Sequence, residues 1–414
     1  MADPSRGGRA APALDDTSLA RQGGPDALSL ALIDARNRTL RWLQRFEDVG
    51  RLAGGADHPA VPWWLAGRAG WFQEVWIARH VQRLRGEEAD PQGPRLASIE
   101  PRADAWFSAL PGPPAAAEAG VDLPDLATLR AYLAQTLEAT LELLESAAST
   151  DEALHGFRVA LLHEDRLAER MAVAAQWLQV DPLDAAAPCA APPARRDRAP
   201  LLVPPGPAHL GSPVAGCVPP SERGKERVDV PALEIDAQAV SWARYGEFVA
   251  DGGYDDRRWW DEDGWQWLQS SGRRAPRGVE QWQGAVVVQR HGRLQRAPAG
   301  QAVAHVSWYE ARAWCRWAGR SLPLESQWVR GRSAVAGAFA WGDVWEWTAS
   351  SARALDGAPA GRVAGWPEPG PDPSWRVLRG ASSWTVPRAA HPGARRYAHP
   401  ARDDLFCGFR SCAA

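Results

Sequence analysis

Apolar residues recur at three- and four-residue spacing through much of the first 180 positions, which is the period of a helix face packed against a core. The pattern predicts four helices, at residues 27–49, 63–84, 126–147 and 153–178. The third helix carries its leucines at this spacing as one apolar stripe: Leu129, Leu133, Leu137, Leu141 and Leu144. Four helices of this kind favour a helical bundle.

The pattern stops at residues 181–198, where Ala, Pro and Arg dominate without periodicity and Pro cannot continue a helix. We therefore place a linker there. The expected organisation is a disordered N-terminus at residues 1–25, a helical bundle at 26–180 and a second domain at 199–414.

The second domain differs from the helical part in its pattern of apolar residues and in its tryptophan content. Short apolar segments alternate with Gly and Pro turns, and 16 of the 23 tryptophans lie there. This is typical of an irregular α+β domain held together by aromatic packing. One helix is clear, because Ser307 is a natural N-cap, Glu310 completes a capping box and Gly319 ends the run.

The amino-acid composition excludes several classes of protein. The 414 residues predict two or three domains, and 45% apolar residues exclude a disordered chain. Lys and Arg number 47 against 50 Asp and Glu without a basic block, so we expect no nucleic-acid partner. No uncharged apolar run approaches the ~18 residues of a membrane span, and the first residues lack a signal-peptide core. We expect a soluble, cytoplasmic protein without a membrane partner.

The cysteines are odd in number and form no C-x-x-C pair, so they indicate neither a disulfide framework nor a cysteine zinc site. They are Cys189, Cys217, Cys315, Cys407 and Cys412.

Several longer motifs carry a family resemblance. Four ordered segments resemble the formylglycine-generating-enzyme-like, or sulfatase-modifying-factor, domain: residues 305–331, 341–351, 375–384 and 402–412. Two N-terminal segments, GWFQEVW at 70–76 and LLHEDRLAE at 161–169, resemble the DinB-like four-helix bundle that is fused to this domain in ergothioneine and selenoneine synthases. Residues 248–260 are similar to the selenoneine side of that group.

The resemblance implies an activity and its cofactor. Members of the group hold a mononuclear non-heme Fe(II) on three histidines of the bundle and use O2 to join sulfur or selenium to the imidazole of histidine betaine. The sulfur or selenium comes from a thiol or a selenosugar. Neutral imidazoles suit such a site because they hold iron while leaving positions open. The small-molecule substrates are expected between the two domains.

Two of the three implied ligand positions have changed in this chain. Two ligands normally stand as H-E-x-x-H on one helix face, but here His163 is followed at the fourth position by Leu167. The third ligand position, three residues before Trp71, holds Arg68, whose guanidinium has no lone pair to offer. The family also keeps a Tyr-Pro-Gly-Phe stretch after W-E-W-T, where this chain has Leu355 in place of the tyrosine.

Other side chains are candidate replacements for the two missing iron ligands. For each of them, a purely structural role is the alternative. His163 is either the surviving iron ligand or an ordinary interior histidine. Glu74, Glu164 and Glu169 either supply oxygen ligands or serve as outer-sphere or solvated helix charges. The remaining histidines before the linker are His58, His80 and His155, of which His155 lies within about 80° of His163 on a regular helix.

The second domain supplies candidate substrate-binding residues. Arg379, Asp404 and Arg410 stand in family motifs, and such charges suit the ends of an amino-acid-derived substrate. The alternative is that Arg410, with residues 345–347, chiefly holds the loops of the domain together. Cys407 and Cys412 flank G-F-R differently from the sulfatase-activating branch, which argues against copper-dependent cysteine oxidation.

Two functional hypotheses follow from the sequence. The first is an iron-dependent oxygenase that forms a C–S or C–Se bond with a rebuilt ligand set. The second is an iron-free binding or regulatory descendant of that family. In both, we expect the helix with His163 to face the C-terminal domain across a polar cleft.

Overall fold

A computed structural model describes residues 14–53, 61–108, 124–182, 191–212, 216–282, 285–358, 365–366 and 370–414. His58, Cys189 and residues 1–13 of the expected disordered N-terminus lie outside them, whereas residues 14–25 are described and include helix α1 (Leu19–Gln22).

The N-terminal part is a bundle of four long helices, which confirms the pattern predicted from the sequence. They are α2 (Pro25–Asp48), α3 (Pro62–Gln73), α6 (Leu126–Glu145) and α7 (Asp151–Trp177). Side-chain caps set two of the starts, because Asp125 accepts from the amide of Thr128 and Thr150 from that of Ala153. The second helix is shorter than expected, since α3 passes into a π-helical turn, η1 (Glu74–Ala78). Shorter helices complete the region: α1 (Leu19–Gln22), η2 (Arg83–Glu88) and α4 (Ala103–Phe107).

The C-terminal part is built on small sheets. One four-stranded sheet has the order β11-β10-β9-β12, in which β9 and β12 are parallel; a second has the order β1-β4-β13-β8. The strands are β1 (Leu201–Val203), β4 (Leu233–Ile235), β8 (Arg320–Ser321), β9 (Trp345–Ser351), β10 (Arg376–Gly380), β11 (Arg395–Ala398), β12 (Cys407–Phe409) and β13 (Cys412–Ala413). Two smaller sheets pair β2 (Gly206–Leu210) with β3 (Glu226–Val230), and β5 (Val279–Gln281) with β6 (Val287–Arg290) and β7 (Arg293–Arg296). The expected α+β class is therefore confirmed.

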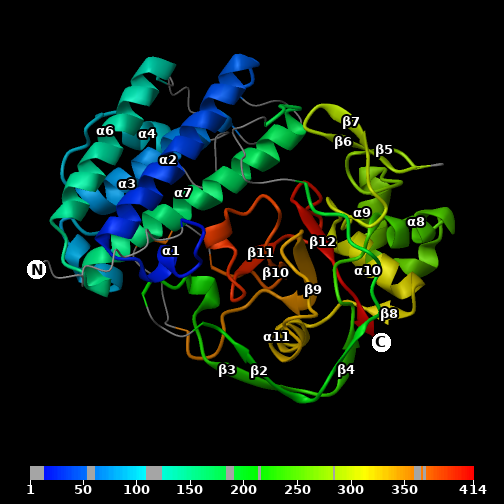
Figure 1. The fold of residues 1–414 in the computed structure, drawn as a ribbon. Coiled ribbons are helices and arrows are strands. Elements are labelled where there is room, and N and C mark those ends of the chain that lie inside the picture. Colours follow the sequence, from blue (N-terminus) through cyan, green and yellow to red (C-terminus); the bar gives the residue numbers. More distant parts are fainter. Residues whose placement is uncertain are drawn as a thin grey trace, which may run out of the picture.

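Helices and short helical turns pack around these sheets, and Figure 1 shows several of the helices on the side away from the bundle. They are α8 (Trp242–Ala250), α9 (Glu262–Ser271), α10 (Trp308–Trp317) and α11 (Glu325–Ala334), with the short turns η4 (Pro220–Glu222), η5 (Arg257–Trp259) and η6 (Pro387–Ala389). The capping box predicted for α10 is present, because Ser307 Oγ accepts from the amide of Glu310 and the Glu310 carboxylate accepts from that of Ser307.

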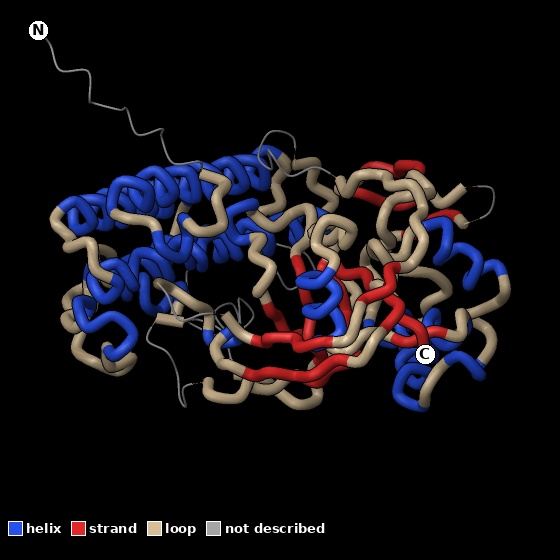
Figure 2. Tube along the Cα trace, turned by 60° about the horizontal axis from the view of Figure 1, so that its bottom comes forward, coloured by secondary structure: helices blue, strands red, loops and turns tan. Residues whose placement is uncertain are grey.

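Helix α7 joins the two parts of the molecule. Figure 1 shows it along the side of the bundle next to β10 and β11, and Figure 2 shows the long helices at one end and most strands at the other. Trp384 and Phe406 of the C-terminal part belong to the same apolar core as the helices of the bundle. The paired carboxylate of Asp165 and guanidinium of Arg388 also cross this boundary, at 2.7 and 2.8 Å.

The capping carboxylate of Glu310 makes the stability of the C-terminal part depend on pH. It is buried and accepts a hydrogen bond of 2.6 Å from Tyr254, but burial outweighs this and raises its pKa from 4.5 to about 7. The unfolded chain loses this proton first as pH rises, so the free energy of unfolding falls by about 3 kcal/mol between about pH 4.5 and 7. Urea unfolding at several pH values should show that Glu310→Gln lacks this component. Equal pH slopes for parent and variant would contradict the assignment.

Candidate functional site

His163 lies inside the bundle. Its ring packs on Phe72 at a centroid distance of 4.1 Å, and its buried Nε2 has no hydrogen-bond partner. Burial, followed by the cationic side chains of Arg68, Arg170 and Arg166, holds its pKa well below the ordinary value of 6.5. The imidazole is therefore neutral at pH 7, which is the form that binds metals.

The other two implied ligand positions are filled by groups that stabilise the bundle. Arg68 donates to the carbonyl of Phe107 at 2.5 Å, and its guanidinium lies 4.2 Å from the centre of the Trp71 ring. Its pKa is lowered to about 10 by burial, so the side chain remains a cation at pH 7. Leu167 is 1% exposed and belongs to the apolar core shared by the two parts of the chain.

Two of the candidate acidic ligands, Glu164 and Glu74, accept hydrogen bonds from neighbouring groups of the bundle. Glu164 pairs with Arg36 at 2.9 Å and accepts from Thr39 and Gln73 at 2.7 and 2.9 Å. Glu74 accepts from the phenol of Tyr132 at 2.6 Å and from the segment around Ser98. Both carboxylates are thus supplied with donors by other helices and loops of the bundle.

The two other described histidines of the bundle, His80 and His155, have polar neighbours. His80 stacks on Trp76 at 5.2 Å and its Nε2 lies 3.1 Å from the carbonyl oxygen of Asp90. His155 Nδ1 lies 3.8 Å from a carboxylate oxygen of Glu87.

Iron does not fit this donor set. Within the described residues, no group of three or more His, Cys, Asp or Glu side chains is arranged to hold a metal ion. One neutral imidazole remains beside a buried arginine, and like charges repel at short range.

A cavity of about 320 Å3 opens further along α7, between the bundle and the C-terminal part. Helix α7 contributes Glu169, Arg170 and Val173, and the C-terminal part contributes aromatic and basic side chains: Trp345, Trp375, Arg396, Tyr397, His399 and Arg402. The expectation that α7 faces the C-terminal domain is confirmed. His163 does not line this cavity, so the expectation that it borders the cleft is corrected; its ring turns inward toward Phe72.

Glu169 is held at the wall of the cavity by donors from the C-terminal part. Trp345 Nε1 and Ser382 Oγ donate to its Oε1 at 2.8 and 2.6 Å, and Arg396 Nη2 lies 2.7 Å from its Oε2. Arg396 also stacks on Trp345 at 4.2 Å. Glu169 is therefore an interdomain anchor that positions the cationic and aromatic wall.

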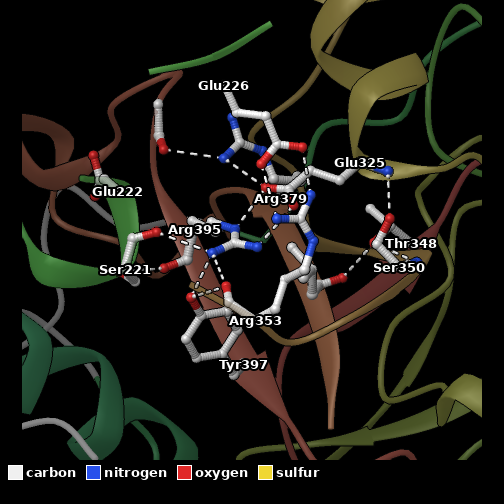
Figure 3. Close-up of polar contacts among 12 residues, drawn as sticks. Ser221, Glu222, Glu226, Glu325, Thr348, Ser350, Arg353, Arg379, Arg395 and Tyr397 are labelled. Carbon is white, nitrogen blue, oxygen red and sulfur yellow. Dashed lines mark hydrogen bonds and ion pairs between the residues drawn. The ribbon is translucent and has the colours of Figure 1, made fainter. Parts of the chain in front are cut away.

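Arg379 does not reach this cavity. It is buried next to Glu325 and donates to the carbonyls of Gly393 and Pro392 at 3.1 and 3.0 Å. Figure 3 shows Arg379 and Arg395 converging on the Glu325 carboxylate, which Arg395 contacts at 2.7 and 3.0 Å. The side chain therefore ties β10 to the loop before β11.

The two other predicted substrate-binding residues, Arg410 and Asp404, also form ion pairs within the protein. Arg410 is fully buried and contacts Glu346 at 2.5 and 2.7 Å, while Asp404 pairs with Arg402 at 2.5 and 2.7 Å. None of Arg379, Asp404 and Arg410 lines the interdomain cavity.

Sequence reasoning missed the run from Arg396 to His399 on and after β11. Its mixture of basic and aromatic side chains is a signal, but nothing in their spacing shows that they meet α7. Tyr397 borders the cavity, but its hydroxyl accepts from Arg395 at 2.5 Å and donates to the carbonyl of Arg353 at 3.2 Å, and neither of these residues lines the cavity. The family tyrosine position holds the buried Leu355.

The described cysteines are buried, and burial raises the pKa of the Cys412 thiol to about 11 and that of Cys407 well above 9. These are unreactive thiols at pH 7.

Comparison with known proteins defines the class and then the family. Residues 187–343 match the sulfatase-modifying factor enzyme 1-like domain, so the C-terminal part contains a domain of that class. The hercynine oxygenase of Mycobacterium tuberculosis is 32% identical, over 93% of this chain and 98% of that protein. The hercynine oxygenase of Mycolicibacterium thermoresistibile is 31% identical, over 92% of this chain and 94% of that protein. The chain belongs to the hercynine oxygenase family.

Solved structures match more distantly. PvdO from Pseudomonas aeruginosa is 18% identical with a TM-score of 0.33, over 53% of this chain and 99% of that chain. Separately, no described helix has the length and apolar character needed to cross a bilayer.

Proposed function

We propose that this chain is an iron-free binding member of the hercynine oxygenase family, whose interdomain cavity takes a small zwitterion of the histidine-betaine class. The observation that carries this proposal is that Arg68 and Leu167, which stand at two of the implied ligand positions, make contacts that stabilise the fold. One is held by the Phe107 carbonyl and the Trp71 ring, and the other is part of the core.

The lining of the cavity suits both ends of such a ligand. Arg170, Arg396 and Arg402 line the wall; Arg396 pairs with Glu169 and Arg402 with Asp404, and further N–H groups of these guanidinium groups are donors for charge-assisted hydrogen bonds to a carboxylate. Trp375 supplies an aromatic side chain to the lining, and aromatic faces attract a quaternary ammonium group.

The iron-dependent alternative is favoured by the similarity to hercynine oxygenases and by the buried and unpartnered Nε2 of His163. In that alternative the cosubstrate is a thiol or a selenosugar, whose sulfur or selenium is joined to the imidazole of the betaine. The same measurements separate the two functions.

The test is calorimetric titration of the purified protein with histidine betaine, in the presence of chelator and after anaerobic loading with Fe(II). Binding should be unchanged by the chelator, with no stoichiometric iron and no O2-dependent product from a thiol or a selenosugar. Arg396→Gln should weaken binding on the order of 10- to 100-fold, because it removes a charge-assisted contact. Arg402→Gln provides a second test if Arg396→Gln fails to fold.

Arg258→Gln is the matched control, since Arg258 is exposed and pairs locally with Asp256. Binding that appears only with iron and disappears in His163→Ala would overturn the proposal in favour of the oxygenase. Absence of binding under both conditions would overturn the betaine assignment.

A further inference from the structure

A second cavity lies on another side of Phe406, separate from the α7 wall at Glu169. It has a volume of about 220 Å3 and is enclosed by the end of α7, the β6–β7 hairpin, and the segments at residues 302–305 and 383–384. Nothing in the proposed function uses it.

The walls of this cavity are fixed by specific contacts. Gln176 of α7 donates to the carbonyl of Gln289 at 2.8 Å and accepts from the amide of His291 at 3.1 Å, which pins the hairpin to the helix. The hairpin turns at His291 and Gly292, both with positive φ, as a two-residue turn of this geometry requires. A Cβ at Gly292 would lie 2.6 Å from the carbonyl oxygen of Gln179, so glycine permits this close approach.

His305 is held in an unusual conformation at the same cavity. Its φ of 61° is rare for a residue with a side chain and costs about 1–2 kcal/mol. The ring is wedged between Trp177 at 4.8 Å and Phe406 at 5.1 Å. Backbone strain of this kind persists where the surroundings impose it, and such residues cluster at functional sites.

Unpartnered polar atoms gather in these walls. Trp242 Nε1, His291 Nδ1 and His305 Nδ1 are buried without a hydrogen-bond partner, and all three residues line the cavity. Burial lowers the pKa of His291 to about 4 and that of His305 to about 3, so both rings are neutral at pH 7. Buried polar groups are normally satisfied, and a cluster of exceptions points to a missing partner.

The ion pairs of the lining residues indicate the charge of the missing ligand. Asp343 is paired with Arg195 at 2.7 and 2.8 Å, Arg277 lies 3.2 Å from Asp403, and Arg293 is paired with Asp181. Arg290 donates to the amide oxygen of Gln301 at 2.6 Å, and no carboxylate within the described residues lies within 4 Å of its guanidinium. Among the described lining residues, the positive charge of Arg290 is therefore left without an ion-pair partner.

The apolar side of the cavity is aromatic. Trp384 and Phe406 stack at 5.5 Å with an interplanar angle of 25°, and His291 meets Trp384 edge-on at 4.9 Å. Flat rings form favourable offset or edge-on contacts with such walls. We propose that this cavity is a second binding site, for a small monoanion with a flat aromatic body, whose carboxylate pairs with Arg290.

The test uses benzoate as probe and benzamide as its neutral isostere, each titrated calorimetrically into the full chain. Benzoate should bind at least tenfold more tightly than benzamide. Arg290→Gln should remove this preference, whereas Arg396→Gln, which tests the other cavity, should leave it intact. Ala304→Leu fills the cavity without changing its charge and should abolish binding of both probes.

Equal affinities for benzoate and benzamide would overturn the proposal, as would no detectable benzoate binding at millimolar concentrations. Retention of benzoate binding in folded Ala304→Leu would place the probe elsewhere and also overturn it. Because histidine betaine binding is followed through Arg396, either proposal can fail without the other.

Discussion

The double variant Arg68→His, Leu167→His is expected to gain Fe(II) affinity of at least about 100-fold over the parent protein. Positions 163 and 167 share one face of α7, and His163 packs on Phe72, one turn after Arg68 in α3, so the three positions lie near one another. Outer-sphere changes alone alter metal affinity by about 10- to 100-fold, and restoring two ligands should exceed this. The measurement is anaerobic metal titration with iron quantification.

Each single change should have little effect. In Leu167→His the Arg68 cation remains beside the site, and in Arg68→His only two imidazoles are present. Leu167→His also places a polar ring in the apolar core, so the metal-free double variant should be less stable than the parent and should recover stability when metal is added. Additive gains from the two single variants would contradict a shared site.

Asp165→Ala is expected to lower the free energy of unfolding by about 3–5 kcal/mol. The side chains of Asp165 and Arg388 are both 0% exposed, and removal of the carboxylate leaves a buried guanidinium short of a partner. Asp34, 2.8 Å from Arg388, limits the loss but does not replace the two contacts made by Asp165. Urea unfolding at constant pH measures the change.

The matched control is Asp255→Ala, which breaks the exposed ion pair with Arg274. Its effect should not exceed about 1 kcal/mol, since water screens such pairs. The variant Asp165→Ala, Arg388→Leu should recover part of the lost stability, because it leaves no unpaired buried charge. Equal effects of Asp165→Ala and Asp255→Ala would show that the interdomain pair does not support the fold.

Local sequence patterns determined the helices well, because their signals are contained within a few turns. The leucine stripe of α6 and the capping box at Ser307 depend on neighbours three or four residues apart. The end of α3 at Gln73 was missed, since the apolar pattern continues through the π-helical turn that follows it.

For the candidate site, too, the sequence predicted some features and not others. From the resemblance, the sequence marked His163 as the retained implied ligand position and Arg68 and Leu167 as the two altered ones, because each stands inside a continuous motif. It also offered Arg379, Asp404 and Arg410 as substrate contacts, but a motif does not show where its side chains point. Only the tertiary structure decided that Arg379 turns toward Glu325 and that Arg410 is buried on Glu346.

Both cavities are likewise products of tertiary structure. Arg396 meets Glu169 across 227 positions of the chain, and His291 and His305 come together with Trp384 although they lie on separate segments. The sequence determined the local elements and the loss of two implied iron ligands, since these depend on residue type at short spacing. The meeting of α7 with β11 and with the β6–β7 hairpin depends on long-range packing, which has no local signal.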